Sequence, residues 1–134
     1  MSKADGTGAT FRVGLIQMRS GRTPAANLDA ATKLIGEAKA GGADYVQTPE
    51  MTNILEAKRD ALMAAIVPED EDRSLAGFRE VARQHRLWLH IGSLALKMTP
   101  DRAVNRRYSR SSMNKRTSCR PASAPTVGDT TGAF

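Results

Sequence analysis

One short stretch, residues 43–50 (Ala-Asp-Tyr-Val-Gln-Thr-Pro-Glu), limits most strongly what this chain can fold into. It comes after a pair of glycines, a common way for a helix to end, and Tyr45 and Val46 at its centre favour a β-strand. Pro49 cannot donate a hydrogen bond to a sheet, so the strand is expected to end there. Glu50 comes next, and ligands of open α/β sheets bind outside the carboxyl ends of the strands. Glu50 is therefore a candidate site residue, and a solvated loop carboxylate is the alternative that its position alone allows.

The segments around this stretch predict alternating strands and helices, and hence an α/β fold. Strands are expected where β-favouring apolar residues gather, at residues 11–18, 43–48 and 87–96. Helices are expected where apolar residues recur every three or four positions, at residues 24–40, 55–66 and 74–85. Thr23 and Ser74 are the predicted N-caps. The first helix is long enough to connect two parallel strands.

The basic character of the chain is confined to its last quarter. A length of 134 residues allows one domain at most. Residues 1–101 hold 13 basic and 13 acidic side chains, whereas residues 102–134 hold seven basic and one acidic, which accounts for the net charge of +6. Residues 106–126 contain no Leu, Ile, Val or Phe, so we predict that residues 106–134 are disordered. The predicted division is a flexible N-terminus (1–10), a folded part (11–105) and this tail.

Other features limit the compartment and the cofactors. The single cysteine, Cys119, excludes an internal disulfide framework. The N-terminus lacks the apolar segment of a secretory signal, and no stretch approaches the ~18 apolar residues of a membrane span. We therefore expect a soluble, cytoplasmic protein. No cofactor is expected. No metal is expected either, because the acids within residues 68–72 are consecutive, which is typical of a solvated loop at a helix entry rather than of a metal site.

Two residues of the third predicted strand need interpretation. His90 lies between apolar neighbours and is interpreted as a packed strand histidine with one satisfied nitrogen rather than a catalytic group. Gly92 inside the strand indicates a bulge or a close approach of another backbone segment.

Three stretches together resemble the front of the nitrilase superfamily, the carbon–nitrogen hydrolases. Residues 11–18 (Phe-Arg-Val-Gly-Leu-Ile-Gln-Met) look like the first strand of that family. Asn27, the apolar stripe of the first helix and the strand that ends in Pro49-Glu50 resemble the family's first helix and second strand, and residues 89–93 (Leu-His-Ile-Gly-Ser) resemble the next strand. The resemblance covers about residues 11–105. It implies a partial α-β-β-α sandwich, because the family fold is roughly twice as long as this chain.

The resemblance also implies a chemistry. The family hydrolyses small amides or nitriles with a Glu, a Lys and a Cys, and Glu50 matches the Glu. The Cys attacks the carbon, the Glu moves protons and the Lys stabilises the developing charge. Lys115 and Cys119 stand only four residues apart and do not match the spacing of the family's pair. We therefore predict a truncated or frame-shifted family member that is inactive as given.

Two other classes of function stay open as alternatives. A small α/β module with a basic tail could bind nucleic acid, but only Tyr108 could stack on a base within the tail, and we do not expect this partner. A scaffold retained for dimer formation is the other alternative, since a homo-oligomer is a further expectation from the family. The missing second sheet predicts one exposed apolar sheet face that is prone to associate.

Overall fold

The fold alternates strands and helices, as predicted. The computed structural model describes residue 8 and residues 10–111, without the side chains of residues 110 and 111. The elements in chain order are β1 (Val13–Leu15), α1 (Pro24–Ala40), β2 (Tyr45–Gln47), α2 (Arg59–Ala65), a 3-10 turn η1 (Glu69–Glu71), α3 (Arg73–His85), β3 (Trp88–Thr99) and β4 (Arg102–Ser111).

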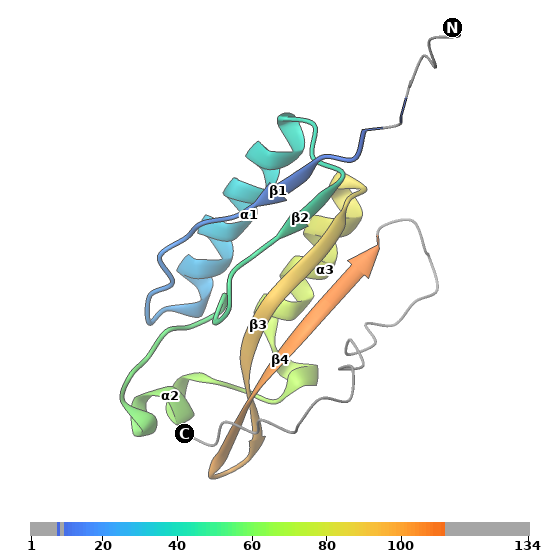
Figure 1. The fold of residues 1–134 in the computed structure, drawn as a ribbon. Coiled ribbons are helices and arrows are strands. Elements are labelled where there is room, and N and C mark those ends of the chain that lie inside the picture. The colour runs from blue at the N-terminus through green and yellow to red at the C-terminus, as the bar shows by residue number, and fades with distance from the viewer. Residues whose placement is uncertain (1–7, 9, 112–134) are drawn as a thin grey trace, which may run out of the picture.

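The four strands form one sheet in the order β1-β2-β3-β4. β1, β2 and β3 are parallel, and β4 returns antiparallel to β3 as a hairpin. The helices α1 and α3 lie side by side against one face of the sheet (Figure 1). This is the predicted arrangement, because a parallel strand needs a crossover connection and both crossovers here contain a helix.

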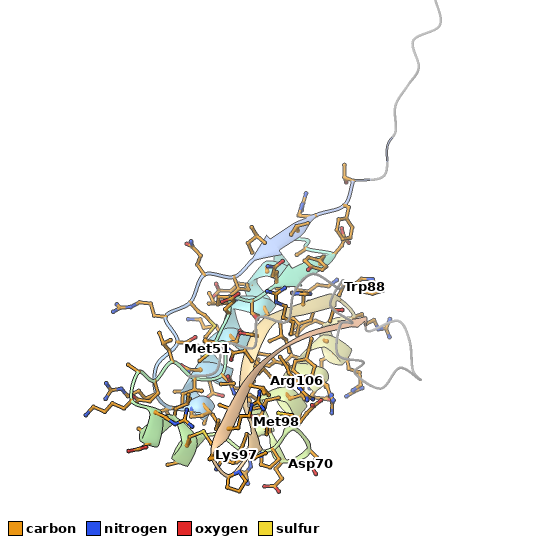
Figure 2. The ribbon with its side chains drawn as sticks, turned by 60° about the horizontal axis from the view of Figure 1, so that its bottom comes forward. Met51, Asp70, Trp88, Lys97, Met98 and Arg106 are labelled. Carbon is orange, nitrogen blue, oxygen red and sulfur yellow. The ribbon has the colours of Figure 1, made fainter. Side chains whose placement is uncertain are left out.

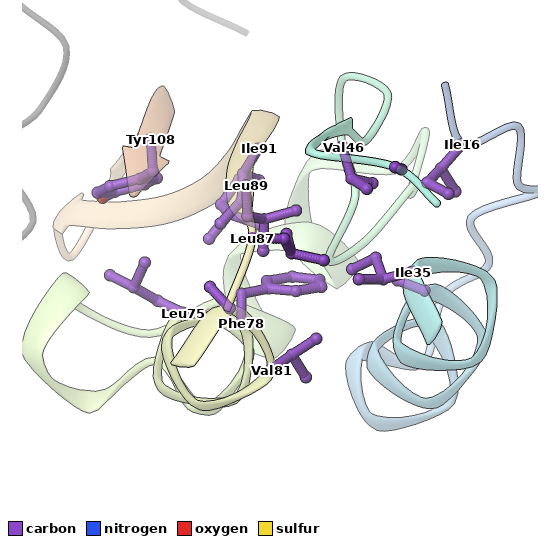
Figure 3. Packing of buried hydrophobic residues seen from close by; sticks show 14 of the residues in the cluster. Ile16, Ile35, Val46, Leu75, Phe78, Val81, Leu87, Leu89, Ile91 and Tyr108 are labelled. Carbon is purple, nitrogen blue, oxygen red and sulfur yellow. The ribbon is translucent and has the colours of Figure 1, made fainter. Parts of the chain in front are cut away.

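The main core lies between the sheet and these two helices (Figure 3). Alternation along each strand sends every second side chain to this layer. Val46 and Leu89 meet Ile35 of α1 and Phe78 of α3 within one cluster, and all four are almost fully buried. Tyr108 of β4 belongs to the same cluster, so its ring is not available to stack on a nucleic-acid base.

In the described part of the chain, a second cluster covers the opposite face of the sheet at its hairpin end. Ala95 packs with Ile54, Leu62 and Ile66 in a second cluster, whereas its neighbours Leu94 and Leu96 belong to the main core. Alternation therefore places Ala95 on the face opposite α1 and α3, and the segment that contains α2 covers that end. Val13, Leu15 and Trp88, on the rest of this face, are exposed, as the sequence predicted.

The prediction that order ends at Asn105 is wrong. Residues 106–111 belong to β4, and Tyr108 pairs with Ile91 while Arg106 pairs with Leu94. Composition suggested disorder because the strand is rich in Arg and Ser, but a polar edge strand can be held by its backbone ladder and a single buried ring. Three basic residues assigned to the tail, Arg106, Arg107 and Arg110, therefore belong to the sheet. Residues 112–134 lie outside the described part.

Several local predictions need correction. The strands at 11–18 and 43–48 shorten to three residues each, and the helix expected at 55–66 spans Arg59–Ala65. Thr23 precedes α1 without a side-chain cap. The N-cap of α3 is Asp72 rather than Ser74, and its carboxylate accepts a hydrogen bond from the Leu75 amide at 2.6 Å. Asp72 is thus buried and structural, not part of a solvated loop.

Among the described residues, none of the helices has the length and apolar content to cross a bilayer.

Candidate functional site at the end of the second strand

Glu50 lies on a turn directly after β2, as its position in the sequence predicted. The turn runs beside β3: the Thr48 amide donates to the His90 carbonyl at 3.0 Å, and the Thr52 amide donates to the Ser93 carbonyl at 2.9 Å. Thr48 and Thr52 are buried on either side, whereas 77% of the Glu50 side chain is exposed. The fold therefore places a solvent-facing carboxylate on a turn whose flanking residues, Thr48 and Thr52, are buried.

Two threonine hydroxyls hold the inside of the turn together. The Thr52 hydroxyl donates to the Pro49 carbonyl at 2.6 Å and lies 2.8 Å from the Thr48 hydroxyl. A hydroxyl has only one proton to donate, so Thr48 donates to Thr52. The pair fixes the backbone on both sides of Glu50.

The residue after Glu50 adopts an unusual conformation. Met51 has φ = 52°, in the left-handed region that a residue with a side chain seldom occupies. Its amide donates to the Ser93 hydroxyl at 2.9 Å, which ties the turn to β3. Such conformations persist where the surroundings hold them in place, and they cluster at functional sites.

Gly92 lets the turn lie against β3. A Cβ atom at this position would be 2.5 Å from the Pro49 carbonyl carbon and 2.6 Å from the Thr48 carbonyl oxygen. Both distances are far inside van der Waals contact, so any side chain would displace the turn. The close backbone approach predicted from the sequence is confirmed.

Two buried asparagines anchor the end of the turn. The Asn53 amide group donates to the Ala95 carbonyl at 2.8 Å and accepts from the Ala95 amide at 2.9 Å. Asn27 of α1 donates to the backbone carbonyls of Asn53 and Gly21. Asn53 also interacts with Asp72, whose pKa is raised by burial, an effect that hydrogen bonds from the backbone and from Asn53 oppose. The turn is thus tied to α1, α3 and β3 at once.

A cation from β4 stands beside Glu50. The Arg107 guanidinium lies 3.9 Å from the Glu50 carboxylate, and both side chains are largely exposed. The contact is a loose surface ion pair of the kind that adds little stability. It nevertheless places a guanidinium where an anionic ligand beside Glu50 would meet it.

His90 borders the same area. It lies half-buried on β3, and its ring stacks with that of Tyr45 at 6.4 Å between centroids. Burial lowers the pKa of His90, and the charge of Arg107 lowers it further. His90 is therefore partly packed, as the sequence predicted, and the lowered pKa favours its neutral form; the hydrogen bond to one of its ring nitrogens stays a prediction.

The candidate site shows no preorganised metal centre. Among residues 8 and 10–111, no three His, Cys, Asp or Glu side chains gather closely enough to hold a metal ion. Lys115 and Cys119 lie outside the described residues, so their position relative to Glu50 is not part of this geometry.

Comparison with protein families identifies the fold. A profile described as carbon-nitrogen hydrolase matches residues 12–113. The chain belongs to the carbon-nitrogen hydrolase family. The match continues eight residues beyond Asn105, where the sequence interpretation placed its end, and it includes all of β4. Comparison with curated proteins gave no significant match.

Three solved structures illustrate the similarity of the fold. The NitFhit protein of C. elegans is 25% identical, with a TM-score of 0.63 over 75% of this chain and 24% of its own. An amidase from Nesterenkonia sp. is 23% identical, with a TM-score of 0.65 over 78% of this chain and 40% of its own. Saccharomyces cerevisiae Nit3, of the nitrilase superfamily, is 21% identical, with a TM-score of 0.65 over 83% of this chain and 43% of its own. The chain spans less than half the length of each of these proteins.

Sequence reasoning found Glu50 but missed the residues around it. Arg107 was assigned to a disordered tail, and nothing marked Asn53 as a buried anchor. The only available signal was Tyr108, a large ring in a polar segment, which is a hint that one face of that segment is buried.

Proposed function

We propose that this chain is the front part of a carbon-nitrogen hydrolase that acts on a small amide or nitrile, with Glu50 as its acid–base residue. The observation that carries the proposal is the contrast between the exposed Glu50 carboxylate and its buried frame of Thr48, Thr52 and Asn53. Preorganised groups on rigid elements favour catalysis because no energy is then lost in ordering them during the reaction. The family match over residues 12–113 supports the same class of reaction.

In this proposal Glu50 moves protons for a cysteine nucleophile. The carboxylate takes the thiol proton as the sulfur forms a bond to the amide carbon, and the protonated Glu50 then gives that proton to the departing nitrogen. Ammonia leaves, and a thioester remains. Glu50 next takes a proton from water as the hydroxide attacks the thioester carbon, and the thiolate that leaves takes this proton back from Glu50, which restores the thiol and releases the carboxylic acid product. A lysine would stabilise the charge that develops on the oxygen.

We infer that the chain as given does not complete this cycle. The described residues supply Glu50, whereas the only cysteine, Cys119, stands four residues from Lys115 in the sequence rather than on a separate strand. Residues that act as a unit lose most of their rate enhancement when one is missing. We propose a truncated or frame-shifted family member because this explains both the family match over residues 12–113 and the close spacing of Lys115 and Cys119.

The coding DNA provides the first test. The two other reading frames downstream of the codon for Met113 are translated. They are searched for a further strand, a segment with a lysine, and a cysteine that follows another strand. If neither of these two frames encodes such a continuation, the frame-shift proposal is contradicted.

Where a frame does encode it, the restored chain tests Glu50. Ammonia release from short amides and nitriles is measured for the restored parent, for Glu50→Gln and for Glu37→Gln. Glu37 is an exposed carboxylate on α1, so the same chemical change is made away from the turn. We expect Glu50→Gln to lower kcat roughly 10²- to 10⁴-fold and Glu37→Gln to leave it unchanged. Equal activity of the two variants would refute the role of Glu50.

A further inference from the structure

Asn27 belongs to the family resemblance, but the proposed chemistry gives it no role. It is the fourth residue of α1 and is buried, with 5% of its surface exposed. The Gly21 amide donates to the side-chain oxygen of Asn27 at 2.8 Å. The side-chain nitrogen of Asn27 donates to the carbonyls of Gly21 at 2.9 Å and of Asn53 at 2.8 Å. Both protons of this nitrogen are therefore used, and they hold two different segments of the chain.

The two segments follow neighbouring strands. Gly21 lies in the loop between β1 and α1 (residues 16–23), and Asn53 ends the turn that carries Glu50 (residues 48–53). β1 and β2 are parallel neighbours, so both segments leave the carboxyl ends of adjacent strands. Ligands of open α/β sheets bind outside this edge. The two joined segments are therefore those that would border a substrate beside Glu50.

Two further contacts hold the same segments together. The Leu55 amide donates to the Gly21 carbonyl at 2.9 Å, so that this carbonyl accepts hydrogen bonds from both Leu55 and Asn27. The Arg22 side chain lies 3.1 Å from the Glu56 carboxylate, and only 5% of the Glu56 side chain is exposed. Asn27 is the member of this set that lies on a helix and contacts both segments.

We propose that Asn27 is a positioning residue for Glu50, which locks the β1–α1 loop to the Glu50 turn so that both form one rigid wall of the site. This rests on the proposed function for the role of Glu50. Asn27 acts through the backbone of Asn53, three residues after Glu50, and not on the reacting atoms. Position matters at this scale, because a displacement of about 1 Å can lower an enzymatic rate about 100-fold.

A merely stabilising role makes a different prediction. Loss of stability raises the small unfolded fraction but leaves the folded state as it was, so the resonances and backbone order of the folded chain do not change. Loss of positioning changes the folded state itself, within the two joined segments. Backbone order parameters, which report motion on the picosecond to nanosecond timescale, therefore separate the two roles.

The full chain is studied by NMR as the parent and as two Asn27 variants. Asn27→Asp keeps the size of the side chain and an acceptor for the Gly21 amide, but its carboxylate has no proton to donate. Asn27→Ala removes all three hydrogen bonds. Asn105→Asp makes the same change as the first variant at an exposed asparagine of β4 and is the matched control. Val81→Ala, at a buried residue of α3, is the control for lost stability.

The reporter amides and the reference amide lie in different parts of the sheet. The reporters are Met51, whose amide is bonded to the Ser93 hydroxyl, and Leu55. The reference is Trp88, whose amide donates to the Asp44 carbonyl at 3.1 Å. Trp88 lies at the start of β3, away from Met51 on the turn (Figure 2).

In Asn27→Asp we expect the order parameters of Met51 and Leu55 to fall from about 0.85, the value of a rigid backbone, to below about 0.6. The Glu50 amide resonance should shift, because the turn that carries it is no longer held in one position. Trp88 should keep the order parameter of the parent. The two control variants should leave all of these values unchanged, even where Val81→Ala lowers the stability.

Unchanged order parameters of Met51 and Leu55 in Asn27→Asp would overturn the proposal, and so would an equal fall at Trp88, which would indicate a general loosening. If circular dichroism shows that Asn27→Asp does not fold, Asn27→Ala decides by the same criteria. Failure of both variants to fold would indicate a global role and would overturn the proposal as well. None of these readouts depends on turnover, so the positioning role can fail while the ammonia-release test of Glu50 succeeds, and the reverse.

Discussion

The two faces of the sheet differ in how completely this chain covers them. On one face, α1 and α3 bury Val46, Leu89 and Tyr108 in a single cluster. On the other, the α2 segment covers the hairpin end and leaves Val13, Leu15 and Trp88 exposed. One face of the sheet therefore forms the main core, whereas the other keeps large apolar side chains in contact with solvent.

The largest difference between the faces should appear in stability. Phe78→Ala removes a fully buried ring from the helix side and should cost about 3–5 kcal/mol. Trp88→Ala removes a half-exposed ring from the opposite face and should cost about 2 kcal/mol, because only about half of the ring's transfer free energy is realised there. Urea unfolding followed by circular dichroism at low protein concentration measures both, and comparable losses would remove the distinction between the faces.

The turn that carries Glu50 should depend on its buried anchor. Asn53→Ala removes two hydrogen bonds to the Ala95 backbone and leaves buried polar groups without them, so we expect a loss of about 2–4 kcal/mol. Asn105→Ala changes an exposed asparagine on β4 and should stay within about 0.5 kcal/mol of the parent. Urea unfolding measures both variants. An Asn53→Ala variant as stable as the parent would show that the turn is held by other contacts.

A smaller effect should separate two glycines. Gly92→Ala would place a Cβ 2.5 Å from the Pro49 carbonyl carbon and should cost about 1–3 kcal/mol through displacement of the turn. Gly36→Ala lies in α1, where the nearest atom outside the helix is 3.9 Å away, and it should stabilise by about 0.5–1 kcal/mol because alanine favours a helix. Thermal unfolding compares the two variants. A change of Tm in the same direction for both would contradict the close approach of the turn to Gly92.

The smallest effect concerns the protonation of His90. Its pKa lies below 6.5, lowered first by burial and then by Arg107. Its contribution to stability is therefore fully present above pH 6.5 and is lost as the pH falls through the lowered pKa. Imidazole resonances followed by NMR should show His90 titrating below pH 6.5, and Arg107→Gln should raise this pKa. His85, on α3, is the internal control, and an unchanged His90 pKa in the variant would refute the influence of Arg107.

How far the sequence could predict the fold depended on where each element gets its stability. The helix at 24–40 was predicted at its observed bounds because Pro24, an apolar stripe and a terminal glycine are local signals. Residues 106–111 were missed because β4 is held by pairing with β3 and by Tyr108 in the core, neither of which composition reveals. Asp72 was misread for the same reason, since its burial under α3 depends on tertiary packing.

The candidate site divides in the same way. Glu50 could be placed from the strand and the proline before it, and Gly92 could be read as a close approach. Arg107 could not, because it reaches Glu50 only through the hairpin. The role of Asn53 could not be predicted either, because its hydrogen-bond partner, the backbone of Ala95, is 42 residues away in the sequence.

We propose that Glu50 belongs to a catalytic set that this chain does not assemble by itself. Ammonia release from short ω-amides and nitriles by the purified chain tests it most directly, with Glu50→Gln and Cys119→Ser measured beside the parent. We expect no turnover above the uncatalysed rate for any of the three proteins. Turnover by the parent that both substitutions abolish would show that Cys119 reaches Glu50 and would contradict the account.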